Sequence, residues 1–307
     1  MNSQPGSAIA IGTIRGGQIA IGRSGRIHVA WNGSGKAVPR GNGNSSPMLY
    51  SRLNDAGTAF EPQRNVMQIG SALDGGGTVS ADAEGNVYVA WQAAEVAGRG
   101  EAARRFWVTH SADDGKTFPK EHPATSEATG ACGCCSTRIF ADPRGEVLAL
   151  YRAATGGTAR DMFLLTSHDH AATFSGHSVD PWVLNTCPMS SEAFAASPSG
   201  PLASWETKGQ VYFARVDSRT GRTGPVTAAP GPSTARKHST LGVNNRGEIL
   251  FAWTEGTGWQ RGGALAWQIY GPDGQPLGRT KRMEGGIPAW GLPTVVALSD
   301  GSFLLVH

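Results

Sequence analysis

One short pattern recurs six times along the chain: a glycine, followed by an apolar stretch that in most copies ends on an aromatic residue. The copies are SGRIHVAW, EGNVYVAW, RGEVLALY, SGPLASW, RGEILFAW and DGSFLLVH, which end at Trp31, Trp91, Tyr151, Trp205, Trp253 and His307. Successive end points lie 60, 60, 54, 48 and 54 residues apart. Such short apolar stretches between turn residues are typical of β-strands. The chain is therefore expected to consist of six similar β-units.

In most copies another β-rich stretch precedes the glycine, as in STRIFADPRGEVLALY, so each unit begins as a hairpin with a glycine in its turn. A period near 50 residues with several strands per unit is typical of a β-propeller blade, whereas a sandwich or solenoid of irregular strands would not repeat in phase. We therefore expect residues 1–307 to form a single all-β domain, a six-bladed β-propeller. The last copy ends after its second strand, and we expect the N-terminal SAIAIGT, residues 7–13, to supply the missing outer strands.

The composition agrees with many short strands and limits the classes of function. The chain has 43 glycines and 18 prolines, and only 17% of its residues are charged. The formal net charge is +3 and no run of five like charges occurs, so a nucleic-acid partner has no electrostatic support. No stretch approaches the length of a membrane span. The N-terminus lacks the basic start and apolar core of a signal peptide.

A second motif has the form Ser-x-Asp-x-Gly-x-Thr-Phe and is complete in SADDGKTF, residues 111–118. LNDAGTAF, residues 53–60, and SHDHAATF, residues 167–174, keep most of it. In such a turn the Asp side chain accepts backbone N–H groups, the glycine adopts a φ that other residues resist, and the aromatic ring packs beneath. The motif is therefore expected to be structural.

This motif is the Asp box, and the chain resembles the sialidases and other proteins with BNR repeats. The resemblance implies a sialidase-like six-bladed propeller in which the box joins the third and fourth strands of a blade, away from the functional site. It implies fold rather than chemistry. A small-molecule or glycan ligand, a monomeric state and a periplasmic or secreted location, with the targeting segment removed, are expectations of the same kind.

In a propeller the first strand of each blade lines the central channel, and the loops that enter these strands surround one mouth of it. Aligning the six repeats predicts that these loops carry Arg15, Asp74, the cluster CGCC at residues 132–135, Cys187, Lys237 with His238, and Trp290. Three successive blades would therefore direct sulfur, sulfur and imidazole toward one mouth, although these residues are far apart in sequence.

Our main hypothesis for this site is a metal centre with ligands drawn from Cys132, Cys134, Cys135, Cys187 and His238. Thiolates with one imidazole favour copper, particularly Cu(I), with zinc as the alternative. Cys-x-Cys-Cys is not a standard zinc-finger spacing, and there is no second Cys-x-x-Cys. The resemblance to bacterial sialidase-like propellers that carry a Cys-x-Cys-Cys and a later Cys-Pro favours the same interpretation.

Two other interpretations of the cysteines remain open. The four could form two disulfides, one within the cluster and one to Cys187, which in an exported protein would join neighbouring blades. Alternatively, Arg236, Lys237 and His238 could lower the pKa of one cysteine and activate it as a nucleophile.

A sialidase would need three arginines to bind a carboxylate, a Tyr–Glu pair and an acidic Asp. Arg15 occupies the position expected for the first arginine, and Arg152, Arg160 and Asp161 are further candidates, as is Lys237 for catalysis. The family's Arg-Ile-Pro is replaced here by IRGG, no Tyr–Glu pair is evident, and Tyr151 is expected to be a core aromatic. We interpret Arg152, Arg160 and Asp161 as an ion-paired hairpin beside the site. The sequence thus favours a copper-binding propeller, a copper-handling protein or a copper-dependent oxidoreductase. A sialidase-type glycoside hydrolase is the alternative, or a disulfide-stapled binding scaffold.

Overall fold

The computed structural model describes residues 2–12, 14–96, 98–125, 129–142, 144–232 and 235–307. Within these ranges the chain is all-β, with β-strands and three short 3-10 turns, η1 (Arg23–Gly25), η2 (Asn42–Asn44) and η3 (Glu101–Ala103). Its strands form six separate sheets, all antiparallel. No helix in the described ranges has the length and hydropathy to cross a membrane.

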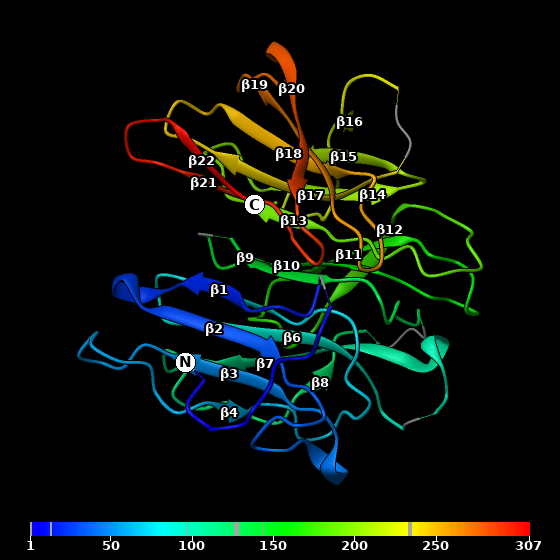
Figure 1. Cartoon of the computed structure of the whole chain (residues 1–307). Helices are drawn as coiled ribbons and strands as arrows, with labels where there is room; N and C mark the ends of the chain where they lie inside the picture. The colour runs from blue at the N-terminus through cyan, green and yellow to red at the C-terminus, as the bar shows by residue number, and fades with distance from the viewer. Residues whose placement is uncertain (1, 13, 97, 126–128, 143, 233–234) are drawn as a thin grey trace. The chain divides into compact units, whose positions relative to one another are not determined.

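The chain divides into two compact units, Met1–Pro188 and Met189–His307, each with three sheets (Figure 1). The sheets of the first unit are β1 (Gln18–Ile21), β2 (Ile27–Asn32), β3 (Met48–Arg52) and β4 (Arg64–Asn65); β5 (Thr78–Ala81), β6 (Val87–Ala94), β7 (Arg104–Ser111) and β8 (His122–Pro123); and β9 (Thr137–Ala141), β10 (Val147–Arg152), β11 (Met162–Ser167) and β12 (Ser175–Asp180).

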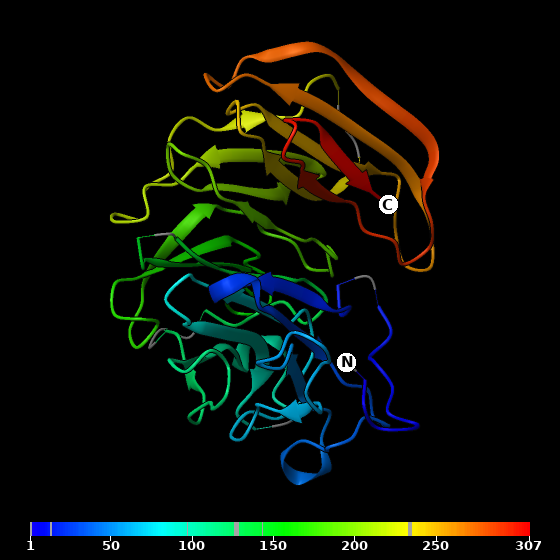
Figure 2. The ribbon, with the colours of Figure 1, turned by 90° about the vertical axis from the view of Figure 1, so that its left-hand side faces the viewer.

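The second unit has two four-stranded sheets and one two-stranded sheet. They are β13 (Ala193–Ala195), β14 (Leu202–Thr207), β15 (Gln210–Arg215) and β16 (Thr227–Ala228); β17 (Arg236–Val243), β18 (Ile249–Glu255), β19 (Gly263–Tyr270) and β20 (Pro276–Ile287); and β21 (Thr294–Ala297) with β22 (Phe303–Val306). Figure 2 shows β20 as the long orange strand at the edge of its sheet.

The repeated sequence pattern forms the second strand of every sheet, as expected. Trp91, Tyr151 and Trp253 at the ends of three copies are completely buried, because these central strands are covered on both faces. Within each unit the first strands of successive sheets lie side by side, β1 by β5 and β5 by β9, then β13 by β17 and β17 by β21. Closure of the six sheets into one propeller domain over residues 1–307 stays a prediction.

The three Asp-box segments lie where the resemblance implies, between the third and fourth strands of their sheets. Residues 53–60 join β3 to β4, residues 111–118 join β7 to β8, and residues 167–174 join β11 to β12. In the last of these, Asp169 accepts hydrogen bonds from the Thr173 hydroxyl and from its N–H at 2.9 Å. These bonds lower the pKa of Asp169 to about 2. The boxes are therefore turn structures, as predicted.

The expected role of the N-terminal segment is wrong. Residues 8–10 bond to the end of β2 and the residues just after it, with Ala10 N–H donating to Asn32 O and Ser34 N–H donating to Ala8 O, both at 2.8 Å. The neighbouring backbone groups satisfy this segment at a low cost in loop-closure entropy because they are close in sequence. Among the described residues, the last sheet therefore has only β21 and β22. Thr13, the end of the predicted segment, lies outside the described residues.

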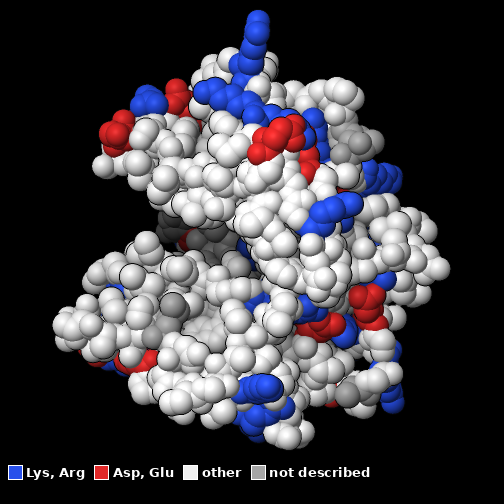
Figure 3. All heavy atoms as spheres, in the orientation of Figure 1, with Lys and Arg blue, Asp and Glu red and all other residues white. Residues whose placement is uncertain are grey.

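The side chains on one face of the protein (Figure 3) show the mixture of positive and negative charge expected from the small net charge of +3. On the face drawn in Figure 3, lysine and arginine are scattered among aspartate and glutamate and do not form one continuous basic surface.

Candidate functional site

The cysteine cluster lies in the loop directly before β9, the first strand of the third sheet, as predicted. The loop turns through a hydrogen bond from Cys135 N–H to Cys132 O at 3.2 Å. Cys132 N–H donates to Arg152 O at 2.9 Å, and Gly76 N–H donates to Cys135 O at 3.0 Å. Backbone bonds to the second and third sheets of the first unit therefore hold the loop on both sides.

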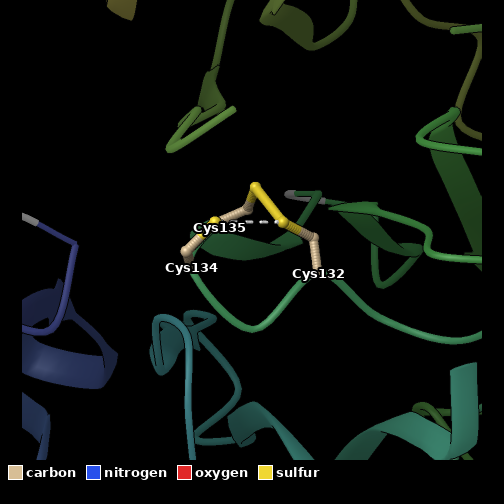
Figure 4. Close-up of side chains that lie close together, drawn as sticks. All are labelled: Cys132, Cys134 and Cys135. Carbon is tan, nitrogen blue, oxygen red and sulfur yellow. Dashed lines mark hydrogen bonds between the residues drawn. A yellow bond between two sulfur atoms is a disulfide. The ribbon is translucent and has the colours of Figure 1, made fainter. Parts of the chain in front are cut away.

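All four cysteines form disulfides. Cys132 is bonded to Cys135 with 5.4 Å between their Cα atoms, and Cys134 is bonded to Cys187 with 6.3 Å between theirs. The Sγ atoms of Cys132 and Cys134 lie 3.4 Å apart, so the two disulfides are in contact (Figure 4). The structure agrees with the disulfide interpretation of the cluster.

The reactive-thiol hypothesis is wrong for this state of the protein. The described residues include every cysteine, and none of these is free. An oxidised sulfur cannot act as a thiolate nucleophile, because the thiolate is the reactive form.

The predicted metal ligands are only partly brought together. The Sγ atoms of Cys132, Cys134 and Cys135 all lie within 4.8 Å of one another. His238 is on β17 in the second unit, where its Nδ1 lies 3.1 Å from Ser191 Oγ. Burial, with a contribution from Lys237, lowers the pKa of His238 to about 3, so its imidazole is neutral. Its place beside the cysteines stays a prediction.

A group of charged side chains surrounds the cysteine loop, and we call Arg15, Asp74, Glu101, Arg104 and Arg160 the arginine–carboxylate cluster. Arg15 Nη2 forms an ion pair with Asp74 Oδ1, and Arg104 Nη1 lies 3.1 Å from Asp74 Oδ2. Arg160 Nη2 lies 2.6 Å from Glu101 Oε2. The Asp74 and Glu101 side chains remain 33% and 30% exposed, so solvent reaches both carboxylates.

Hydrogen bonds join the cysteine loop to the arginine–carboxylate cluster. Gly133 N–H donates to Glu101 Oε1 at 2.5 Å, and Ala131 N–H donates to Glu101 O at 3.1 Å. A Cβ at position 133 would lie 2.7 Å from Arg104 Nη1 and 2.9 Å from Asp74 Oδ2. The ends of the Arg104 and Asp74 side chains therefore lie against the backbone at Gly133, on the loop that carries the disulfides, and a side chain there would displace them.

Arg152, Arg160 and Asp161, which we predicted to form an ion-paired hairpin, make several contacts with neighbouring groups. Arg152 is completely buried; its Nη1 donates to Arg160 O at 2.6 Å, and its guanidinium lies 5.1 Å from the centre of the Trp182 ring. Asp161 accepts the Trp182 N–H at 3.0 Å, and Arg160 pairs with Glu101.

The structure also places the candidates Tyr151 and Lys237. Tyr151 is buried, and its hydroxyl lies 2.6 Å from Thr129 Oγ1, which supports its predicted role in the core. Lys237 pairs with Thr254 in the ladder between β17 and β18. Its predicted catalytic role stays a prediction.

The sequence did not single out Glu101 and Arg104. Both lie in GRGEAARRF, the segment that leads into β7, and the only signal was a group of charges in a chain with few of them. Asp74 was expected near the mouth but was not assigned a role. Contacts between residues about 30 and 60 positions apart create this cluster, and a local pattern does not reveal them.

Several solved structures share the fold. The NanB sialidase from Streptococcus pneumoniae aligns with a TM-score of 0.66 and 10% identity over 99% of this chain and 66% of that one. The Hadza microbial sialidase Hz136 aligns with a TM-score of 0.60 and 17% identity, covering 92% of this chain and 60% of that one. A protein of unknown function from Dyadobacter fermentans aligns with a TM-score of 0.58 and 14% identity, covering 98% of this chain and 94% of that one.

This chain therefore spans about three fifths to two thirds of the length of the two sialidases. No protein-family model and no curated protein matches it. At these identities the alignments establish architecture and not activity. The chain has a sialidase-like fold.

Proposed function

We propose that the six sheets close into a six-bladed propeller, and that the protein is a sialidase-type glycoside hydrolase acting on sugars that carry a carboxylate. The sialidase-like fold and the side-by-side first strands within each unit support the propeller. The arginine–carboxylate cluster supports the substrate class, because guanidinium groups bind carboxylates through paired, charge-assisted hydrogen bonds.

The observation that carries the proposal is that Arg15 and Arg104 meet at one half-exposed carboxylate, Asp74. Arg15 comes from the loop before β1, and Arg104 is the first residue of β7. They pair with the two different oxygens of the Asp74 carboxylate, Oδ1 and Oδ2 respectively. A pair of guanidiniums on one carboxylate supports the proposal, because a substrate carboxylate could take the same two partners. Arg160, held by Glu101, is a third guanidinium in the same cluster.

Sialidases differ from most glycoside hydrolases because a tyrosine is the nucleophile, but they still need an Asp as acid and a Glu as the base of the tyrosine. Asp74 and Glu101 are the two carboxyl groups of the cluster, and both are partly exposed. We assign them the proton-transfer roles, with Arg15 and Arg104 orienting the substrate through its carboxylate. The disulfides hold the loop on which this arrangement rests.

The test is hydrolysis of a fluorogenic sialoside by the purified protein, together with calorimetric titration of free sialic acid. Arg15→Ala and Arg104→Ala are each expected to lower kcat/KM by about 100-fold or more, because an oriented charged donor is lost. Arg279→Ala, at an exposed arginine of β20, is the matched control and should leave both measurements unchanged. Binding without turnover would identify a disulfide-stapled glycan-binding scaffold. If the purified protein neither binds free sialic acid nor hydrolyses the sialoside, that result would contradict the proposal.

A second candidate function, thiophilic metal binding, has one specific observation in its favour. Three cysteine sulfurs lie within 4.8 Å of one another, so reduction of both disulfides would release a compact group of thiolates. Such ligands favour copper as Cu(I), with zinc as the alternative, and Cys187 and His238 would complete the set. A copper-handling or redox role follows if this site binds metal.

Metal content separates the two candidates. Protein reduced and loaded with Cu(I) under anaerobic conditions should retain about one copper per chain if the thiolate site forms, and Cys134→Ser should lose it. Sialoside hydrolysis should not depend on added copper. A monomeric state and export to the periplasm or medium are further proposals, which gel filtration and cell fractionation would test.

A further inference from the structure

We propose that the two disulfides form one thiol–disulfide exchange centre, in which Cys134 relays reduction from an exposed disulfide to a buried one. The centre would accept electrons from a dithiol, either a small molecule or a protein dithiol. The inference requires no part of the proposed glycan chemistry.

The two disulfides differ in accessibility. Cys187 is exposed, and its partner Cys134 is half-buried. Cys132 and Cys135 are both completely buried. An external thiolate can therefore reach the Cys134–Cys187 bond, which we call the outer disulfide, but has no direct path to the Cys132–Cys135 bond, the inner disulfide.

The sulfur contact provides an indirect path. Cys134 Sγ lies 3.4 Å from Cys132 Sγ (Figure 4), and because both sulfurs are oxidised this is a van der Waals contact and not a hydrogen bond. Once the outer disulfide is opened, Cys134 Sγ becomes a thiolate, and it lies on the same short loop as the inner disulfide. Intramolecular attack from such a position is strongly favoured over attack from solution.

The relay consists of three thiol–disulfide exchange steps. One thiolate of the dithiol attacks Cys187 Sγ, the outer S–S bond breaks, and Cys134 leaves as a thiolate. The second thiol of the dithiol then attacks the mixed disulfide, releasing Cys187 and leaving the dithiol oxidised by two electrons. The Cys134 thiolate attacks Cys132 Sγ, a Cys132–Cys134 bond forms, and Cys135 leaves as a thiolate that takes a proton from water. This last step transfers no net electrons.

The Cys187→Ser variant tests the relay without any reductant, because it leaves Cys134 without its partner. Alkylation of the folded variant, followed by fragmentation mass spectrometry, should find the label on Cys135 as well as on Cys134, with Cys132 bonded to Cys134 in part of the population. Label confined to Cys134 at all times would overturn the proposal.

Kinetics provide the second measurement. With a limiting dithiol under native conditions, the inner disulfide of the unaltered protein should open at least about tenfold faster than that of the Cys134→Ser/Cys187→Ser variant, which lacks the relay. Equal rates would overturn the proposal. If the variants fail to fold, as judged by circular dichroism, the unaltered protein still decides: label on Cys135 must follow label on Cys187, and label on Cys135 first would contradict the relay.

Discussion

Cys132 and Cys134 are two residues apart and their sulfurs are in contact, yet each belongs to a different disulfide. The inner disulfide spans a sequence separation of 3 and the outer one a separation of 53. A crosslink that closes a longer loop removes more conformational entropy from the unfolded chain. The two bonds should therefore differ in their contribution to stability.

We expect the Cys134→Ser/Cys187→Ser variant to lose about 3 to 4 kcal/mol of unfolding free energy, and Cys132→Ser/Cys135→Ser about 2 kcal/mol. Denaturant titration of both variants under oxidising conditions measures the difference. A larger loss from the inner pair would show that loop length does not control these effects.

Asp74 forms ion pairs with both Arg15 and Arg104. Removing its charge therefore tests the proposed substrate site. In Asp74→Asn the two guanidiniums lose their carboxylate partner, so free sialic acid should bind several-fold more tightly, and more so at low salt. Hydrolysis should fall because a carboxyl group assigned to proton transfer is gone. Calorimetry and the fluorogenic assay measure the two effects.

Glu84→Gln removes one negative charge from an exposed side chain of the same unit and serves as the control. It should change neither quantity. Weaker sialic acid binding by Asp74→Asn would mean that Arg15 and Arg104 do not bind the substrate carboxylate.

We expect the buried His28 to make the free energy of unfolding depend on pH. Its Nδ1 lies 2.7 Å from the Tyr50 hydroxyl. Burial lowers its pKa from 6.5 to about 4; the Asp114 carboxylate opposes this shift, and Arg26 and Arg52 add to it. Between these values the unfolded chain binds the proton and the folded protein does not. The free energy of unfolding should therefore fall by about 2 to 3 kcal/mol from this group as the pH decreases from 6.5 to 4.

His238, with a pKa lowered to about 3, adds a decline of the same sign. Urea titrations at several pH values should show a shallower decline in His28→Gln than in the unaltered protein. His177→Gln, at an exposed position of β12, should leave the slope unchanged. An identical slope in His28→Gln would exclude His28 as a source of the pH dependence.

Gly57 in the first Asp-box segment tests the turn argument. Its φ is +70°, and a Cβ there would meet no atom within 4 Å. Gly57→Ala should therefore cost about 1 kcal/mol through backbone conformation alone. Gly35 also has open space around it but no φ in the left-handed region, so Gly35→Ala should have little effect on thermal unfolding. Equal effects of the two substitutions would contradict the explanation.

The sequence by itself determined the repeating part of this protein. Apolar patterning placed the second strand of all six sheets, and the Asp-box residues placed the turns between third and fourth strands in three of them. These features depend on side-chain alternation and on φ preferences, which act over a few neighbouring residues. The buried position of Tyr151 followed from the same pattern.

Only the tertiary structure decided how the cysteines pair and which charges meet. Four cysteines allow several pairings, and the choice depends on Cα separations set by loops of different sheets. Asp74, in the loop before β5, meets Arg104, at the start of β7, beside Gly133. The N-terminal segment likewise took partners near in sequence, at residues 32–34, and not the last sheet. Such contacts depend on where the folded backbone brings distant residues together, and no short stretch of sequence encodes that position.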